Sequence, residues 1–598
     1  MLATAGRMNA QVKIGDLSAD LTATISGGYT ADYGNETASD HGFTAGGAGT
    51  LTGSYHDPNF LSFNILPFYN QSRAVSGYQS ITDASGVTAS TSIFGGSYFP
   101  GSITYSKLFN SEGNFGFPGL PNYTTHGDSD LFGVTWGEYV PNLPSLSVSY
   151  QQGTNDYSLY GASGNSVSDF RTISGNSAYR ILGFNLNGSY HYSSNQLDLP
   201  EIFADQPAEK SNSESSSYAF GIGHSLPFNG NASASVSRSD VSADYSTGNY
   251  NATIDTVNAG ISFLPIDNLH IGANAQYLDN LTGTLYQSII AAGGEVAPNT
   301  PAESSHSLDV TGYGNYEILP LHTTISGVEE HRDQTFFGQS FTSDTITGTG
   351  SYANFLLGGF VTATLGVTRT SIEPTRVASL GLIGSVNYAR QIRRWTMNAA
   401  VNYNQNAQTI LISYTTSSYG YSGSAGRKIG RRSYFNLSAN GSKSGLTNDP
   451  GSSSFSQGYS GSFSTRYVSA TGAFTRASGN SILTAAGLVA TPIPLPVVTP
   501  SSVILYGGNA YSFGVGGNPM RGLTISASYS KAVSATQGGS ADSNNRTAQA
   551  YAYLQYKFRK VYLNAGYSRL AQSFSGSGTP PVQMSSYYVG ISRWFNFF

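Results

Sequence analysis

The chain has 598 residues and a formal net charge of -5, and it contains 11% charged residues, 13% aromatic residues and no Cys. The lack of Cys excludes disulfide scaffolds, thiolate metal sites, covalent haem attachment and thiol catalysis within this chain. The weak negative charge argues against a nucleic-acid partner. No stretch approaches the roughly 20 apolar residues of a membrane helix. A closed β-barrel needs apolar residues only on its outward face, so the mean hydropathy of -0.20 is compatible with one.

Strands of alternating polarity begin near the N-terminus. The first is expected over residues 16–26, where Leu17, Ala19 and Leu21 alternate with polar residues. Alternation of period two is typical of a strand with one apolar and one polar face. A second strand is expected over residues 43–55. The same texture then continues to the end of the chain, which predicts a single all-β domain.

The clearest repeat is a hairpin over residues 256–277. Its first arm alternates through Val257, Ala259, Ile261 and Phe263, and its second arm alternates in the same way up to Tyr277. The turn formers of residues 265–268 lie between the arms. Two alternating arms around a short turn of this composition predict an antiparallel β-hairpin.

Short and long connections alternate along the chain. The short ones are expected at 57–59, 100–101, 141–144, 182–183, 227–230, 265–268, 319–320, 357–358, 390–394, 428–431, 467–469, 518–522 and 558–560. This rhythm predicts a closed transmembrane antiparallel up-and-down barrel of about 28 strands, with 26 as the alternative. Short turns are then expected in the periplasm and long loops outside the cell.

The expected domain division is an N-terminal periplasmic segment over residues 1–15 and a transmembrane barrel over residues 16–598. Residues 1–11 do not form a recognisable secretory signal. The rhythm weakens over residues 72–91 and 106–129, where the intervening strand is poorly defined. Residues 477–509 contain four prolines and are expected to form an ordered or inward-folded loop, because proline is excluded from a paired central strand.

Aromatic and basic residues recur at the ends of the expected strands. Six tyrosines at or near strand ends indicate the aromatic girdles of a membrane barrel: Tyr29, Tyr55, Tyr277, Tyr403, Tyr529 and Tyr567. Late in the chain, three short turns carry clusters of cations: Arg390, Arg393 and Arg394; Arg427, Lys428, Arg431 and Arg432; and Lys557, Arg559 and Lys560. These cations either flank the bilayer and solvate the turns, or form a docking face for an acidic periplasmic partner.

The last strand ends in aromatic residues: Trp594, Phe595, Phe597 and Phe598. A final strand that ends in Phe resembles bacterial outer-membrane β-barrel proteins, whose C-terminal strand is read by the barrel-assembly machinery. The resemblance implies an outer-membrane location, contact with outer-membrane lipid and recognition through Phe598. The pattern does not say whether Phe597 or Phe598 faces lipid.

No residues have the spacing of a catalytic, metal or cofactor site, and the chain is expected not to be an enzyme. His224 and His270 are expected to line the lumen. The densest charge run, residues 329–333, is either a decorated strand end at a loop or a cation site.

A circular barrel of 28 strands has a backbone diameter of roughly 55 Å and a hole on the order of 40 Å, so its lumen must be filled or flattened. A strand start near Asp16 leaves no room for an N-terminal plug. The architecture resembles the plug-free sheath of porin–cytochrome electron conduits, which implies a multihaem cytochrome in the lumen, with the haem on that partner. The alternatives are a passive porin constricted by its own loops, and a barrel that anchors adhesive or structural surface loops.

Overall fold

The computed structural model describes residues 12–35, 40–69, 84–115, 123–159, 165–199, 209–245, 248–284, 304–336, 338–408, 415–446, 449–478, 504–538, 541–573 and 581–597. These residues form one antiparallel sheet in which each strand pairs with the strands before and after it in the chain. No helix of the described residues is long and apolar enough to cross a membrane.

The first half of the ring contains fourteen strands. They are β2 (Leu17–Gly34), β3 (Asp40–Tyr55), β4 (Leu61–Tyr69), β5 (Ser85–Ile93), β6 (Gly101–Phe115), β7 (Tyr123–Glu138), β8 (Ser145–Leu159), β9 (Ser166–Ile181), β10 (Phe184–Leu199), β11 (Glu209–Leu226), β12 (Gly230–Tyr245), β13 (Gly248–Ile266), β14 (Leu269–Asp279) and β15 (His306–Ile318). A 3-10 turn, η1 (Leu319–Leu321), follows β15.

The second half contains fourteen more strands. They are β16 (Thr323–Phe336), β17 (Gln339–Leu356), β18 (Gly359–Glu373), β19 (Val377–Ile392), β20 (Trp395–Gln408), β21 (Thr415–Ile429), β22 (Ser433–Leu446), β23 (Asp449–Ser464), β24 (Val468–Ser478), β25 (Ile504–Met520), β26 (Leu523–Gly538), β27 (Ala541–Phe558), β28 (Val561–Ser573) and β29 (Val582–Asn596).

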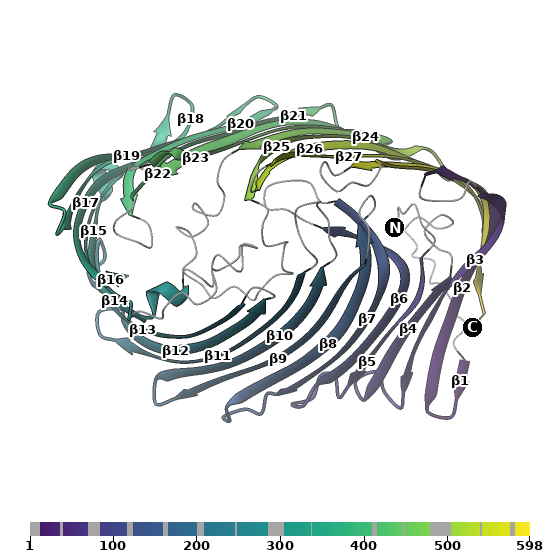
Figure 1. The fold of residues 1–598 in the computed structure, drawn as a ribbon, viewed down its shortest axis with the longest axis horizontal. Coiled ribbons are helices and arrows are strands. Elements are labelled where there is room, and N and C mark those ends of the chain that lie inside the picture. Colours follow the sequence, from purple (N-terminus) through teal and green to yellow (C-terminus); the bar gives the residue numbers. More distant parts are fainter. Residues whose placement is uncertain are drawn as a thin grey trace.

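The ring closes between its first and last long strands. β2 pairs with β29 from Thr22↔Asn596 to Gly34↔Met584 while its other edge pairs with β3. The short strand β1 (Val12–Ile14) pairs with residues 17–19 of β2. Pairing of β2 with β29 begins further along β2, at Thr22. The described strands therefore form a closed barrel of 28 strands, β2 to β29, which confirms the preferred strand count. Figure 1 shows that the ring is longer in one direction than in the other, with β17–β27 opposite β2–β12.

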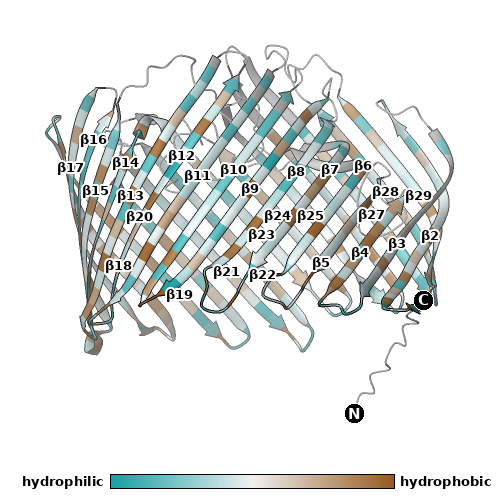
Figure 2. Ribbon diagram, turned by 90° about the horizontal axis from the view of Figure 1, so that it is seen from below, coloured by the Kyte–Doolittle hydropathy of each residue, from teal (hydrophilic) through white to brown (hydrophobic). Residues whose placement is uncertain are grey.

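Short turns lie along one rim of the barrel (Figure 2), and most occur where the sequence predicted them. The connection between β5 and β6 is an exception, because it covers residues 94–100 and not 100–101. Two of the short turns are two-residue loops in which both residues have positive φ: Leu182 and Gly183 at 51° and 86°, and Leu357 and Gly358 at 53° and 75°. This backbone conformation matches the twist of the flanking strands, so the chain can reverse within two residues. The strand ends from which the long connections start lie at the opposite rim.

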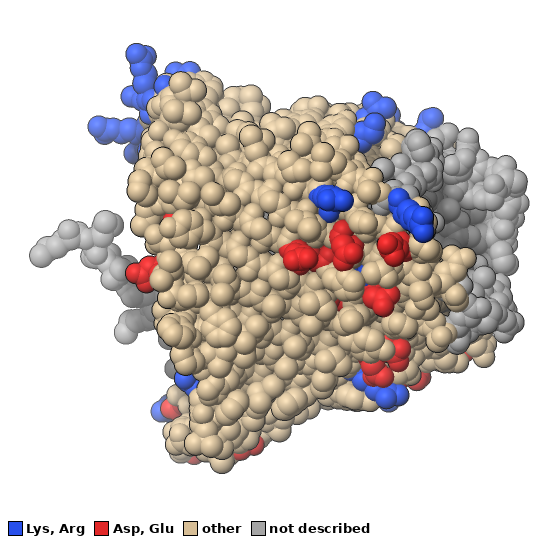
Figure 3. All heavy atoms as spheres, turned by 90° about the vertical axis from the view of Figure 1, so that its left-hand side faces the viewer, with Lys and Arg blue, Asp and Glu red and all other residues tan. Residues whose placement is uncertain are grey.

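The two faces of the wall differ in polarity because the strands alternate. On β2, Ile25 and Tyr29 are exposed on the outer face, whereas Ser26 and Thr30 face inward and are buried. Directly paired residues of an antiparallel sheet share a face, so the register extends this division around the ring. All six tyrosines expected in girdles lie on the outer face. Tyr529 and Tyr567 lie in the middle of β26 and β28, so the expected strand-end position was wrong for these two. Figure 3 shows charged side chains near the two rims and a broad uncharged band between them, as expected for a wall that crosses lipid.

Two expectations about strand boundaries need correction. The stretch near residues 72–129 contains the well-paired strands β5, β6 and β7 rather than one poorly defined strand. The expected loop over residues 477–509 is shorter, because β25 starts at Ile504 and pairs with β26. The bulk of that loop, residues 479–503 with its four prolines, lies outside the described residues.

The orientation of the barrel can be tested with single cysteines, because the chain has none of its own. Asp267→Cys places an exposed thiol in the short β13–β14 turn, and Asn165→Cys places one at the opposite rim, just before β9. In intact cells a membrane-impermeant maleimide should label N165C and not D267C, whereas both should react after the outer membrane is permeabilised. Labelling of D267C alone in intact cells would show that the short turns face the outside of the cell.

Candidate functional site: the lumen of the barrel

The inner wall is dominated by small polar side chains. Ser, Thr, Asn and Gly alternate with the outward apolar residues along each strand, for example Ser233, Ser235, Ser237 and Ser239 on β12. Such residues keep the lumen polar without giving it a strong charge. Channels that select ions generally display rings of charged groups instead.

Hydroxyl side chains on neighbouring strands bond to each other across this wall. The oxygen–oxygen distances are 2.7 Å for Ser18–Ser54, 2.7 Å for Ser102–Thr135, 2.6 Å for Ser149–Ser174, 2.7 Å for Ser193–Ser215, 3.0 Å for Thr347–Thr368, 2.9 Å for Ser351–Thr364, 2.6 Å for Ser438–Ser460 and 2.9 Å for Ser442–Ser456. Burying a hydroxyl that already has a hydrogen-bond partner costs less free energy than burying one that has none. The wall can therefore be covered at low cost in unpaired polar groups.

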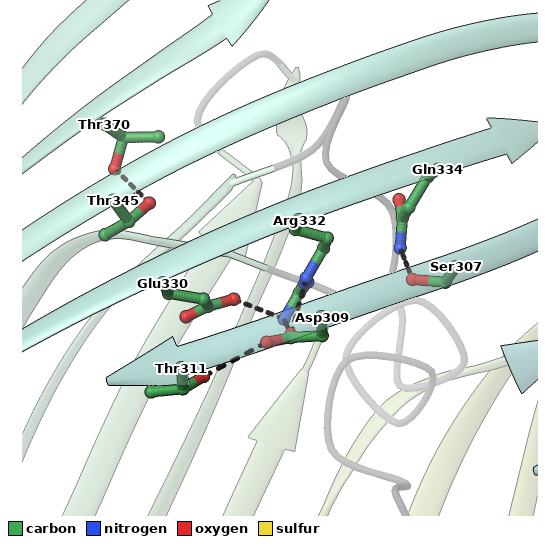
Figure 4. Close-up of polar contacts among 8 residues, drawn as sticks. All are labelled: Ser307, Asp309, Thr311, Glu330, Arg332, Gln334, Thr345 and Thr370. Atoms are coloured by element: carbon green, nitrogen blue, oxygen red, sulfur yellow. Dashed lines mark hydrogen bonds and ion pairs between the residues drawn. The ribbon is translucent and has the colours of Figure 1, made fainter. Parts of the chain in front are cut away.

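One compact group of charges interrupts the neutral wall (Figure 4). Arg332 of β16 donates to the Asp309 carboxylate of β15 through Nε at 2.9 Å and through Nη2 at 2.6 Å. The same Nη2 lies 2.6 Å from Oε1 of Glu330. The Thr311 hydroxyl donates to Asp309 at 3.1 Å. All three charged side chains are less than one third exposed, so mutual pairing stabilises each of them.

The inner wall near this cluster is covered. Gln334 and Ser307 are buried and bond to each other at 3.0 Å. The chain after β14 makes a helical turn over residues 280–284, in which Leu281 is fully buried. Tyr250 of β13 donates to the Gly283 carbonyl at 3.2 Å, and this helical turn lies inside the ring in Figure 1. Part of the connection that follows β14 is thus fixed against the inside of the barrel.

The structure separates the two histidines that were expected in the lumen. His270 faces inward beside Tyr313, as predicted. The prediction was wrong for His224, which pairs with Phe184 on the outer face, with 4.3 Å between ring centroids. His224 lies next to a short turn, at the rim, where an outward polar side chain can reach the headgroup region instead of the lipid tails.

The dense charge run at residues 329–333 does not decorate a strand end, which was one of its two interpretations. It lies within β16, and the alternation of the strand divides it between the two faces. Glu330 and Arg332 face the lumen, whereas Glu329, His331 and Asp333 face outward. In the described part of the chain, no group of three or more His, Asp or Glu side chains could hold a metal ion.

The C-terminal strand orients its aromatic residues in both directions. The outward residues Phe595 and Phe597 stack with their ring centroids 5.8 Å apart, and Trp594 pairs with Thr24 on the inner face. The Phe597 amide donates to the Leu21 carbonyl at 2.9 Å, so pairing with β2 extends to the last described residue. Phe598, which carries the expected contact with the assembly machinery, lies outside the described residues.

The three predicted basic turns lie on one arc of the short-turn rim, and the two short turns between the second and the third also carry cations. Five consecutive turns, from β19–β20 to β27–β28, each present exposed cations: Arg393 and Arg394; Arg431 and Arg432; Arg466; Arg521; and Arg559 and Lys560. Some of these cations lie over aromatic rings, as Lys560 does over Trp594 at 5.6 Å.

A larger segregation of charge was missed in the sequence. Residues 1–376 contain eleven Lys and Arg against thirty-two Asp and Glu, whereas residues 377–598 contain eighteen against two. Because consecutive strands are neighbours in this barrel, a division along the chain becomes a division around the ring. The wall from β2 to β18 is acidic and the wall from β19 to β29 is basic. A running charge count along the sequence would have detected it.

No family model matches the chain, and no curated protein matches it. Solved structures with similar barrels include a mutant ferric enterobactin receptor of Pseudomonas aeruginosa, with 9% identity, a TM-score of 0.43 and coverage of 88% of this chain and 89% of that one. A siderophore receptor of Acinetobacter baumannii has 10% identity, a TM-score of 0.40 and 85% coverage of both chains. An iron transporter of Neisseria meningitidis has 9% identity, a TM-score of 0.37 and coverage of 96% and 81%. Similarity at this level does not transfer a function to this chain.

A closed antiparallel barrel with an apolar outer band, a polar inner wall and short turns along one rim defines an integral membrane β-barrel. The chain is accordingly a bacterial outer-membrane β-barrel of 28 strands that surrounds a polar conduit.

The charge cluster on the inner wall should contribute to stability. Arg332→Met leaves the carboxylates of Asp309 and Glu330 partly buried without their cation, and this should cost about 2 kcal/mol. The matched control is Lys107→Met, which breaks the more exposed outer pair with Asp130 and should destabilise the barrel less, because solvent screens an exposed pair. Denaturant unfolding in detergent micelles measures the free energy of unfolding of both variants and of the wild type. Equal small shifts would show that the cluster does not stabilise the wall.

Proposed function

We propose that this barrel is a wide outer-membrane conduit whose lumen houses a partner protein, with a multihaem cytochrome as the kind of partner. The observation that carries the proposal is the inner wall of hydrogen-bonded Ser and Thr pairs around a ring of 28 strands. Each of these hydroxyls already has a partner within the wall. A protein surface that covers the wall therefore has to accept from one O–H donor of each pair rather than from two.

The width of the ring supports a large occupant. Twenty-eight strands spaced ~4.8 Å apart enclose far more space than the side chains of the inner wall can fill. The flattening seen in Figure 1 narrows the lumen in one direction and leaves it long in the other. An elongated protein is a better match to such a section than a small solute is.

The distribution of charge supports entry of the partner from the periplasm. The basic arc on the short-turn rim extends from Arg393 to Lys560 over five consecutive turns. Complementary charge accelerates association and orients the partner. The occupant is therefore expected to present an acidic surface to this arc.

The first experiment is purification from native membranes in a mild detergent. The proposal expects a protein in stoichiometric amount with a Soret absorbance band, whose haem belongs to that protein because this chain has no Cys. Removal of the partner should convert a non-conducting barrel into a pore of high conductance in planar bilayers. A barrel that purifies alone, without haem, contradicts the proposal.

A second experiment tests the basic arc. The double substitution Arg431→Glu and Arg432→Glu should reduce retention of the partner several-fold at low salt and less at high salt, because exposed charges are screened. The control is Asp267→Lys, which reverses the sign of a charge in a short turn outside the arc. Equal retention in both variants would show that the arc only solvates the turns.

One observation favours the alternative of a porin constricted by its own loops. The buried helical turn at residues 280–284 and the buried inner-wall residues Leu570, Val582 and Met584 show that the lumen is partly covered near the long-connection rim. A lone barrel with a small, stable single-channel conductance would support this alternative. The third possibility, a barrel that anchors surface loops, depends on segments outside the described residues.

A further inference from the structure

The basic half of the outer wall contains a groove within the lipid-facing band. It has a volume of about 840 Å³ and spans β20 to β25 on the upper wall in Figure 1. Small outward residues form its floor, among them Gly423, Ala439 and Gly472, and larger ones such as Leu437 and Phe513 form its sides. Its lining is almost wholly apolar, which suits acyl chains and not a hydrated ligand.

Cations lie on the same outer face, above this groove and on the strands next to it. The register places Lys443, Arg476, Lys531, Arg546 and Arg569 outward on β22, β24, β26, β27 and β28. Arg476 and Phe455 meet at the upper end of the groove, with the guanidinium 5.4 Å from the ring centroid. Among the described residues, no ion pair joins any of these five cations to a carboxylate. Their charge is therefore available to a ligand.

The height of the cations matches the outer boundary of the membrane. Arg476, Lys531 and Arg569 each lie eight residues from the short-turn end of their strands. With a rise of ~3.3 Å per residue and a tilt of about 40°, that distance is roughly 20 Å along the membrane normal. The apolar band of such barrels is about 25 Å tall. The cations thus lie near the outer edge of this band, from which long basic side chains extend to the outer-leaflet headgroups.

We propose that the groove and the cations above it form a binding site for a phosphorylated glycolipid of the outer leaflet. The acyl chains would lie in the groove, and Lys443, Arg476 and Lys531 would contact the headgroup phosphates. Charge complementarity carries the assignment, because phosphates at this level meet cations that form no ion pair with a carboxylate among the described residues. Residues 377–598 contain only two acids, Asp449 and Asp542.

The opposite wall differs at the same height. Its outward cation Arg238 lies 3.6 Å from Asp240 and 3.8 Å from Asp255, so its charge is already offset. That wall also has a hollow, of about 700 Å³, lined in part by Asp130, Arg171 and Glu214. Two concave surfaces do not interlock, which favours a lipid over a second barrel as the occupant of the basic wall.

The site is tested on the purified barrel by native mass spectrometry, with diphosphoryl lipid A, monophosphoryl lipid A and phosphatidylglycerol as probes. The wild type should bind diphosphoryl lipid A most tightly. The triple variant K443Q/R476Q/K531Q should bind it about tenfold more weakly or worse. The matched control K107Q/R238Q/R369Q removes three outward cations from the acidic wall and should bind as the wild type does.

A second variant separates the groove from the cations. A Cβ added at Gly423 would lie 3.5 Å from its nearest neighbour, the Asn398 carbonyl oxygen, so Gly423→Val is sterically tolerable and narrows the groove. It should weaken lipid binding while every charge is kept. Equal binding by the two triple variants, or equal affinity of the wild type for phosphatidylglycerol, would overturn the proposal. So would a change of oligomeric state in K443Q/R476Q/K531Q at unchanged lipid binding. The proposed lipid site lies on the outer face and the proposed partner in the lumen, so the result is independent of the function proposed for the lumen.

Discussion

The closure of the sheet between β2 and β29 is the interaction on which the rest of the structure depends. In lipid an unpaired backbone amide or carbonyl costs several kcal/mol, so a sheet that crosses the membrane cannot have a free edge. Thirteen residues of β2 pair with β29, and the pairing continues to Phe597. Closure makes every strand a central strand, and it also creates an inside and an outside from one alternating pattern.

The inside and the outside are then optimised for different neighbours. Outward residues such as Ile25 and Val589 contribute apolar surface to the lipid. Inward hydroxyls bond to one another across strands, as Ser193 and Ser215 do. The Asp309–Arg332–Glu330 cluster departs from this neutral wall, and its charges are compensated locally. A barrel built in this way presents a smooth polar interior to whatever occupies it.

The charge of the wall is arranged by connectivity. In an up-and-down barrel each strand lies beside its sequence neighbours, so a basic C-terminal part of the chain becomes one continuous basic wall. That wall is positive at the short-turn rim, through Arg431 and Lys560, and again near the outer boundary, through Arg476 and Lys531. The two rims face different environments, which allows the periplasmic arc and the lipid site to act independently.

The sequence by itself determined the class of fold, the strand number, the places of most short turns and the outward direction of the six tyrosines, because these features depend on local alternation and on turn formers. The same local rules failed where the polarity of a side chain does not match the face of the wall on which it lies. His224 is polar yet faces outward, because its place in the β10–β11 register and its closeness to the rim outweigh its polarity. In the run at residues 329–333, strand pleating separates charges that are adjacent in the chain. The pairing of Arg332 with Asp309, the flattened section and the groove beneath Arg476 were decided only by the tertiary structure, since each depends on which strands lie side by side and on how the closed sheet bends.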